Sequence, residues 1–219
     1  MAATGPRGKY ATGIERRERI IDRATKRFIE TGYATTSLAD IAKDVGITTP
    51  GLMHHFPTKQ HLLLAVAERR FDESARVAFE SPPDTDGTGT LRLMYRLRQL
   101  FTVQPGLMEL FVHMAGEAAD RTSAAHELFV ARYDRVIADL TARFRAGVDA
   151  GSLRPDRDYE AIARECIAVS DGLQLQWVLS GGTLDFAGLA RAHLERLSAE
   201  ILVSGEHVDL TVDPPAASA

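Results

Sequence analysis

The chain has 219 residues and a mass of 24.0 kDa, with 45% hydrophobic and 26% charged residues, a composition typical of a folded globular protein. It contains no run of eighteen apolar residues, so we expect no membrane span. The first residues lack the apolar core of a signal peptide, and the single Cys166 cannot form an internal disulfide. We therefore expect a cytoplasmic protein.

The charge is distributed unevenly along the chain. Residues 1–60 carry ten Lys/Arg against six Asp/Glu, a balance of +4, whereas the remainder carries −8 and the whole chain −4. A basic end on an acidic body suits a protein that touches phosphates at one end only. From charge alone, an ordinary solvated surface explains the basic stretch equally well.

The first sixty residues have the pattern of three helices behind a flexible arm. We expect an arm over 1–13, a helix over 14–31 ended by Gly32, and a second helix that starts at Ser37 and stops at Gly46. The third should take Thr49 as N-cap, with Leu52 and Phe56 facing the core. This spacing predicts a helix-turn-helix domain over 14–60.

The rest of the chain is also helical by its apolar periodicity. We expect a long helix from Lys59 to about residue 80, a loop over 81–89, and helices over 90–102, 106–120, 123–150, 158–179 and 184–203. Residues 61–205 would form a second domain, and 206–219 a loose tail. No strand pattern of useful length occurs, so the predicted class is all-α with about nine helices.

The third helix and its surroundings fit the demands of the DNA major groove. Small residues let the N-terminus of the helix approach closely, and its free N–H groups favour phosphate oxygens. Hydroxyls and imidazoles can reach base edges, and a lysine at the next helix can meet a phosphate. The candidates are Thr48, Thr49, Pro50, Gly51, Met53, His54, His55 and Lys59. An ordinary three-helix cluster without a ligand has the same apolar pattern.

The ordered motif Thr36-Ser37-Leu38-x-x-Ile41-Ala42-x-x-Val45-Gly46-Ile47, followed by Gly51-Leu52-x-His54-His55-Phe56-Pro57-x-Lys59, resembles the N-terminal domain of the tetracycline-repressor (TetR) family. The resemblance implies a homodimer of nine-helix subunits, usually a repressor, that a small molecule releases from operator DNA. It adds Thr36 or Ser37 as a DNA contact. Met53 stands where the family usually has a tyrosine, so it either loses a phosphate contact or touches a thymine methyl. Arg23 and Arg27 replace small or apolar residues.

The C-terminal half offers candidates for a dimer interface and for an effector pocket. The segment Asp171 to Trp177 is similar to the end of many such regulators, where the last two helices pair with their twins; the interface candidates are Cys166, Val169, Leu173 and Trp177. Helices four to eight would enclose a largely apolar effector. Methionine and aromatic residues suit such a site, although they are also common core residues. The candidates are Met94, Phe101, Met108, Phe111, His113, Met114, Phe129, Tyr133 and Gln174.

Catalysis is the main rival class of function. The segment beginning His126-Glu127 lacks the second histidine of a zinc-protease helix, and the chain has no Glu-x-x-His pair. We therefore expect no metal, no cofactor and no enzyme. The alternatives left open are an activator or an effector-independent regulator with the same DNA-binding domain, and a helical small-molecule binder or enzyme that has lost DNA binding.

Overall fold

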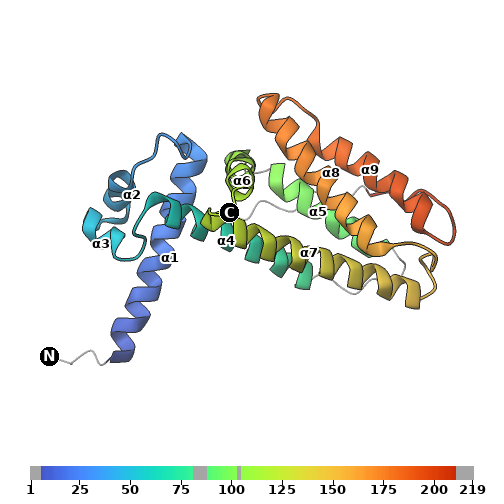
Figure 1. Ribbon diagram of the computed structural model, residues 1–219, viewed down its shortest axis with the longest axis horizontal. Helices are drawn as coiled ribbons and strands as arrows, with labels where there is room; N and C mark the ends of the chain where they lie inside the picture. Colours follow the sequence, from blue (N-terminus) through green and yellow to red (C-terminus); the bar gives the residue numbers. More distant parts are fainter. Residues whose placement is uncertain (1–5, 81–87, 103–104, 211–219) are drawn as a thin grey trace. The chain divides into compact units, whose positions relative to one another are not determined.

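The computed structural model describes residues 6–80, 88–102 and 105–210 (Figure 1). Over these residues it contains nine α-helices: α1 (Pro6–Thr31), α2 (Leu38–Val45), α3 (Thr49–Met53), α4 (Lys59–Glu80), α5 (Gly89–Thr102), α6 (Pro105–Ala118), α7 (Ala124–Asp149), α8 (Tyr159–Leu179) and α9 (Phe186–Ile201). The predicted all-α class is confirmed. Residues 81–87, most of the predicted loop, lie outside the described residues. None of the helices that the structure describes is long and apolar enough to cross a membrane.

The chain forms two compact units that meet within α4, between Arg70 and Phe71. The boundary expected from the sequence lay ten residues earlier, at the start of this helix. Because α4 runs without interruption from the first unit into the second, its apolar pattern contains no signal that separates them. Each unit is described by itself below.

Helix α1 begins at Pro6, eight residues before the predicted start, so the flexible arm expected over 1–13 is wrong for residues 6–13. Pro6 suits a first helical turn, where its missing N–H costs no hydrogen bond. The apolar periodicity that placed the start at residue 14 reports where a helix packs against a core. It does not report where backbone hydrogen bonding begins.

The first unit consists of α1, α2, α3 and the first part of α4, which surround a small apolar core. Ile20, Ile41 and Leu52, one from each of the first three helices, are fully buried. Local chemistry sets the helix ends. Ser37 and Asp40 form the predicted capping box at the start of α2, and Gly46 ends that helix with a φ of 76°, in the left-handed region that glycine adopts without strain.

The core of the second unit is built by α5, α7, α8 and α9, together with the segment that follows α9. The predicted loose tail over 206–219 is wrong for its first five residues. Val208 N–H donates to Ser198 Oγ at 2.9 Å, Arg92 Nη1 donates to Asp209 O at 2.9 Å, and Leu210 is fully buried. The side chains of Val208 and Leu210 and the hydrogen bonds of Val208 and Asp209 hold this segment, which is too short to show a helical period.

Candidate DNA-binding surface and interior polar cluster

The N-terminus of α3 is capped by Thr48 and not, as expected, by Thr49. Thr48 is extended, with φ −77° and ψ 152°, and its Oγ1 accepts a hydrogen bond from Gly51 N–H at 3.2 Å. Two consecutive threonines offer two equivalent caps to sequence reasoning, and only the backbone conformation distinguishes them. A Cβ at position 51 would lie 3.1 Å from the Thr48 hydroxyl, so a small residue there protects the cap.

The outer side of α3 presents most of the residues predicted to contact DNA. Thr48, Pro50, Met53 and His54 are exposed, and the remaining members, Thr49, Gly51 and His55, are partly exposed. On the inner side Leu52 and Phe56 are buried as predicted, and they fix α3 on the unit. Buried anchors therefore hold a small, polar helix face toward solvent, as a groove-binding helix requires.

Of the two candidates at the start of α2, the structure favours Ser37. Thr36 is only 3% exposed, and its hydroxyl donates to Gly32 O and is bonded to the Thr31 hydroxyl, both at 2.9 Å. The prediction that Thr36 reaches DNA through its side chain is therefore wrong. Its hydroxyl closes the turn after α1, which a sequence pattern cannot distinguish from an exposed cap. Ser37 is exposed next to it.

Lys59 lies at the first position of α4, as predicted, but its ammonium already has intramolecular contacts. Nζ donates to Ala34 O at 3.2 Å and lies 4.2 Å from the centroid of the Tyr33 ring. Desolvation lowers the pKa of this amine. An ammonium has three N–H donors, and the bond to Ala34 uses one. These contacts hold the charge of Lys59 at the N-terminus of α4.

Two arginines of α1 lie beside the end of α3, a proximity that sequence reasoning missed. The Arg17 guanidinium stands 5.2 Å from the centroid of Phe56. The pKa of His55 is lowered, first by desolvation and then by the charges of His54, Arg16 and Arg17. The only sequence signal was the positive net charge of the first sixty residues. That signal predicts a basic domain but does not show that Arg16 and Arg17 lie beside α3.

Arg27 ties α1 to α2. Its Nη2 donates to Asp44 Oδ1 at 3.0 Å, and its Nε donates to the other oxygen of the same carboxylate. This bidentate bond lowers the pKa of Asp44. Arg23, the second basic substitution relative to the family pattern, lies with Arg19 and Lys26 along a shallow hollow between the two helices.

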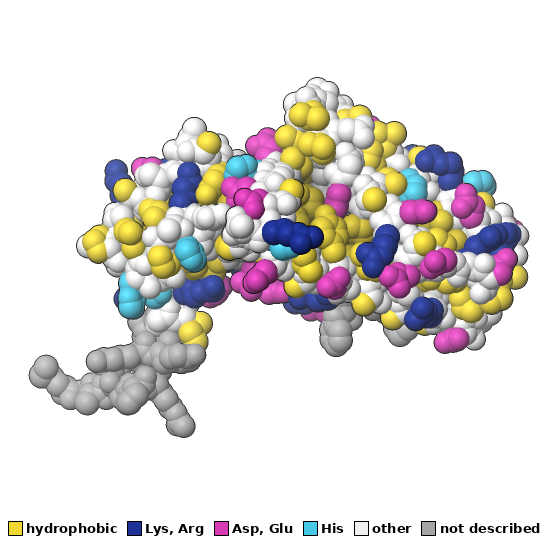
Figure 2. Space-filling model, viewed as in Figure 1, with side chains coloured by type: hydrophobic (Ala, Val, Ile, Leu, Met, Phe, Trp, Pro, Cys, Tyr) yellow, Lys and Arg dark blue, Asp and Glu magenta, His cyan; other side chains and the backbone are white. Residues whose placement is uncertain are grey.

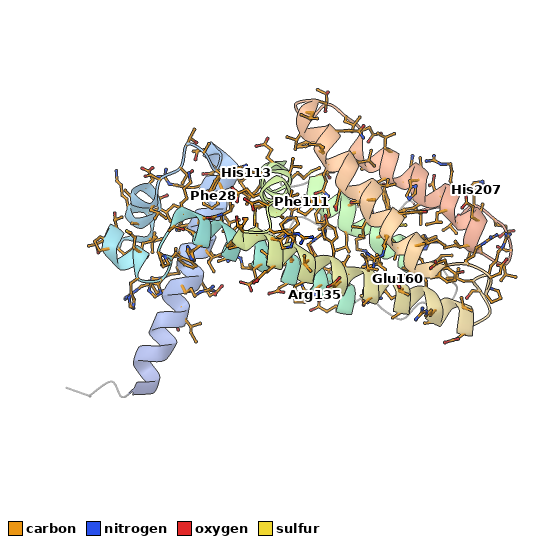
Figure 3. All side chains as sticks on the ribbon, viewed as in Figure 1. Phe28, Phe111, His113, Arg135, Glu160 and His207 are labelled. Carbon is orange, nitrogen blue, oxygen red and sulfur yellow. The ribbon has the colours of Figure 1, made fainter. Side chains whose placement is uncertain are left out.

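In the second unit, four aromatic rings from three helices pack together. Phe71 of α4, Phe111 of α6 and Phe129 of α7 lie with ring centroids 5.4 to 6.4 Å apart, and Tyr133 lies 6.2 Å from Phe129. Figure 3 labels Phe111 on α6. Such distances allow edge-to-face contacts between the rings.

The charged side chains of Arg132 and Asp171 contact this aromatic cluster. The Arg132 guanidinium lies 5.0 Å from the centroids of Phe71, Phe111 and Tyr133. The Tyr133 hydroxyl donates to Asp171 Oδ2 at 2.6 Å, and Gln174 Nε2 donates to the other Asp171 oxygen at 3.3 Å. Burial raises the pKa of Tyr133, and the hydrogen bond to Asp171 adds to that rise.

A second arginine lies deeper in the same unit. Arg98 of α5 is 4% exposed, and it donates to Met94 O at 2.7 Å and to Cys166 O at 2.9 Å. We name Phe71, Phe111, Phe129, Tyr133, Arg98, Arg132, Asp171 and Gln174 the interior polar cluster. Sequence reasoning missed Phe71, Arg98, Arg132 and Asp171.

Only part of the predicted effector set reaches this cluster: Phe111, Phe129, Tyr133 and Gln174. Met108 and Met114 are buried on α6, Met94 belongs to the main hydrophobic core, and Phe101 is partly buried. His113, also predicted as an effector contact, does not reach the cluster: its side chain is 46% exposed and its Nε2 lies 3.3 Å from Glu117 Oε1 on the same helix. It stands two residues from Phe111, which places it on another side of α6.

The predicted dimer stripe on α8 is also only partly exposed. Cys166 is wrong as an interface residue, because it is 1% exposed in the hydrophobic core, where burial raises its thiol pKa to about 11. Val169, Leu173 and Trp177 are partly buried. The large exposed apolar residues of the last two helices are instead Leu175, Leu179 and Leu189, which sequence reasoning missed.

The comparisons with known proteins agree with this geometry. Residues 20–66 match the model of bacterial regulatory proteins of the tetR family, and residues 92–203 match that of the BetI-type transcriptional repressor, C-terminal. The chain is 29% identical over 182 residues to the HTH-type transcriptional regulator TtgR of Pseudomonas putida, covering 80% of this chain and 85% of the relative.

Two solved structures share the fold. A TetR transcription regulator from Haloarcula marismortui has a TM-score of 0.76 at 22% identity, and a transcriptional regulator from Saccharomonospora viridis in complex with choline has a TM-score of 0.72 at 24% identity. Each match covers 86% of this chain and 98% of the other. The chain belongs to the tetracycline-repressor (TetR) family, and it is a DNA-binding transcriptional regulator and not an enzyme.

Proposed function

We propose that the protein represses transcription by binding operator DNA as a homodimer, and that a small-molecule effector bound in the second unit releases it. The observation that carries the DNA-binding part is the exposed polar face of α3 above its buried anchors Leu52 and Phe56. Repression is favoured by the match of residues 92–203 to a repressor C-terminal model.

On this proposal α3 enters the major groove by its N-terminus. Thr49, Pro50, His54 and His55 would face the bases or the adjoining backbone, and Met53, at 45% exposure, would offer an apolar contact to a thymine methyl. Ser37 and Lys59 would meet phosphates, since each stands at the start of a helix, where the helix dipole favours an anion.

The homodimer would form through the hairpin of α8 and α9. Leu175 and Leu179 are four residues apart and so share one face of α8, while Leu189 lies near the start of α9. Figure 2 shows hydrophobic side chains gathered over the end of this hairpin. A second copy of the same hairpin would bury these exposed leucines of two packed helices and so remove their apolar surface from water.

The interior polar cluster is the proposed effector site. It combines aromatic rings with a few polar groups, which is the usual make-up of a small-molecule site. It also contains Phe111, Phe129, Tyr133 and Gln174, predicted from the sequence as effector contacts. A largely apolar effector would pack on these rings, and movement of α6 or α7 around it would be the signal to the DNA-binding unit.

Footprinting of the DNA that flanks the protein's own gene tests the proposal. We expect one palindromic protected site, resistant to competitor DNA, with the two half-sites related by the dimer symmetry. A transcription assay on the same DNA separates repression from activation. If the purified dimer protects no sequence, the DNA-binding role is contradicted. Increased transcription would contradict repression alone.

A further inference from the structure

The interior polar cluster contains a cation that belongs to the chain itself. Three aromatic rings surround the Arg132 guanidinium at 5.0 Å each, a distance at which a cation is attracted to a ring face. The same rings would be the natural wall of a site for a quaternary ammonium, such as the choline bound in the Saccharomonospora viridis structure. In this protein an arginine already occupies that place.

The charge balance of the cluster is positive. Arg98 and Arg132 contribute two cationic groups to the cluster as defined above, and Asp171 is the carboxylate of that set on which both arginines act. Both oxygens of Asp171 already accept hydrogen bonds, from the Tyr133 hydroxyl and from Gln174. Arg98 is bonded to two backbone carbonyls, which carry no net charge. An additional cation would therefore meet repulsion here, whereas an anion would neutralise the excess.

Two polar atoms of the cluster are buried without a hydrogen-bond partner among the described residues. One is Arg132 Nη1, a donor, and the other is Oε1 of Gln174, whose side chain is 1% exposed. A guanidinium N–H can be satisfied only by an acceptor, and it binds a carboxylate most strongly. The unpartnered Arg132 donor and the positive charge therefore both favour an anionic acceptor, whereas Gln174 Oε1 can only accept a hydrogen bond from a donor.

Solvent can reach this part of the unit. Arg132, Tyr133 and Asp171 are each only partly buried. Figure 2 shows a hollow lined with hydrophobic side chains over α6, α7 and α8, the three helices that supply Phe111, Arg132 and Asp171. A ligand with a flat apolar body could enter there and still place a charged group beside Arg132.

We propose that the effector is a small aromatic carboxylate, with its carboxylate on Arg132 and its ring system against Phe111, Phe129 and Tyr133. The inference deepens the proposed function, because it rests on the interior polar cluster being the effector site. Because Arg132 occupies the space between the aromatic rings, the site would bind anions in preference to cations. An organic cation would have to displace the Arg132 side chain, and Arg98 would then repel it.

Direct binding to the DNA-free, full-length protein tests this proposal. The probes are 2-naphthoate, its neutral isostere 2-naphthamide, and the cation benzyltrimethylammonium, with affinity measured by isothermal titration calorimetry. We expect 2-naphthoate to bind about tenfold or more tightly than 2-naphthamide, because the charge-assisted bond to Arg132 is lost in the amide. We expect benzyltrimethylammonium to bind more weakly than either.

The variant Arg132→Gln should reduce the preference for the acid to less than about twofold. Arg135→Gln is the matched control, because Arg135 lies one turn further along α7, is 54% exposed and faces Asp72 at 3.4 Å (Figure 3). Asp171→Asn, which removes the competing carboxylate, should preserve or strengthen acid binding. It tests the charge argument even if the Arg132 variant does not fold, as judged by circular dichroism.

Equal affinity for acid and amide, tighter binding of the cation, no detectable binding of the acid, or loss of acid binding in Asp171→Asn would each overturn the proposal. DNA footprinting with the same protein preparations shows whether the effector class alone is wrong or whether the proposed DNA-binding function is wrong as well. A protein that protects its operator but shows no preference for the acid contradicts only the effector class.

Discussion

Leu179 is the most exposed large apolar side chain among the described residues, at 76%, and it lies at the end of α8. Full burial of a leucine stabilises by about 1.5–3 kcal/mol, so covering the exposed fraction is worth about 1–2 kcal/mol per subunit. A symmetric interface contains this residue twice, which brings the total to roughly 2–4 kcal/mol. Leu179→Ser should therefore raise the dimer dissociation constant by about 30- to 900-fold.

Sedimentation velocity over a range of protein concentrations measures this constant. Val130→Ser is the matched control, because Val130 is 45% exposed but lies on α7, away from the proposed interface. It should leave the dissociation constant unchanged within a factor of two or so, the usual tolerance for a surface substitution. A dimer that is equally stable with Leu179→Ser, or that is weakened equally by both variants, would refute the assignment of the interface to α8 and α9.

Three further substitutions test the DNA-binding surface. Lys59→Ala should weaken binding to all DNA sequences alike, by roughly 1 kcal/mol or about fivefold in gel-shift titrations, and an altered sequence preference would contradict its phosphate role. Thr49→Ala should change the relative affinities of operator variants in competition assays, and an equal loss on every variant would contradict base contact. The pKa of His55 is lowered in the free protein, and nearby phosphates would raise it; affinity should therefore increase as pH falls below about 6.5, and His55→Gln should remove this part of the increase. An unchanged pH profile in His55→Gln would exclude His55 from the DNA contact.

The local architecture of the DNA-binding unit could be read from the sequence because short-range chemistry determines it. A serine followed by an acid three residues later predicted the capping box of α2, and Gly46 predicted its end. Leu52 and Phe56 were identified as buried by their four-residue spacing. The start of α1 was missed because the sequence before residue 14 has no apolar period.

The interior polar cluster could not be read in the same way. Arg98, Arg132 and Asp171 are charged, and sequence rules place such residues at the surface unless a partner distant in sequence is known. Their partners come from other helices: Arg132 of α7 contacts rings on α4 and α6, and Tyr133 of α7 binds Asp171 of α8. Only the folded arrangement shows that these groups meet.

The exposed leucine face of α8 was missed for a related reason. The apolar residues of α8 occur on more than one side of the helix, and periodicity alone does not tell which side faces the core. Cys166 and Leu175 are nine residues apart, about two and a half turns, and so lie on opposite sides. Packing against α7 and α9 buries the side with Cys166 and leaves Leu175 and Leu179 exposed.

The central claim is that the exposed face of α3 reads operator DNA, and salt-dependent binding to the promoter of the protein's own gene tests it most directly. We expect one protected site that survives competitor DNA, with an affinity that falls steeply and log-linearly with salt concentration. The slope should decrease by about one unit in Lys59→Ala. The claim would be contradicted if the purified protein protected no site at low salt, or if competitor DNA abolished the protection completely.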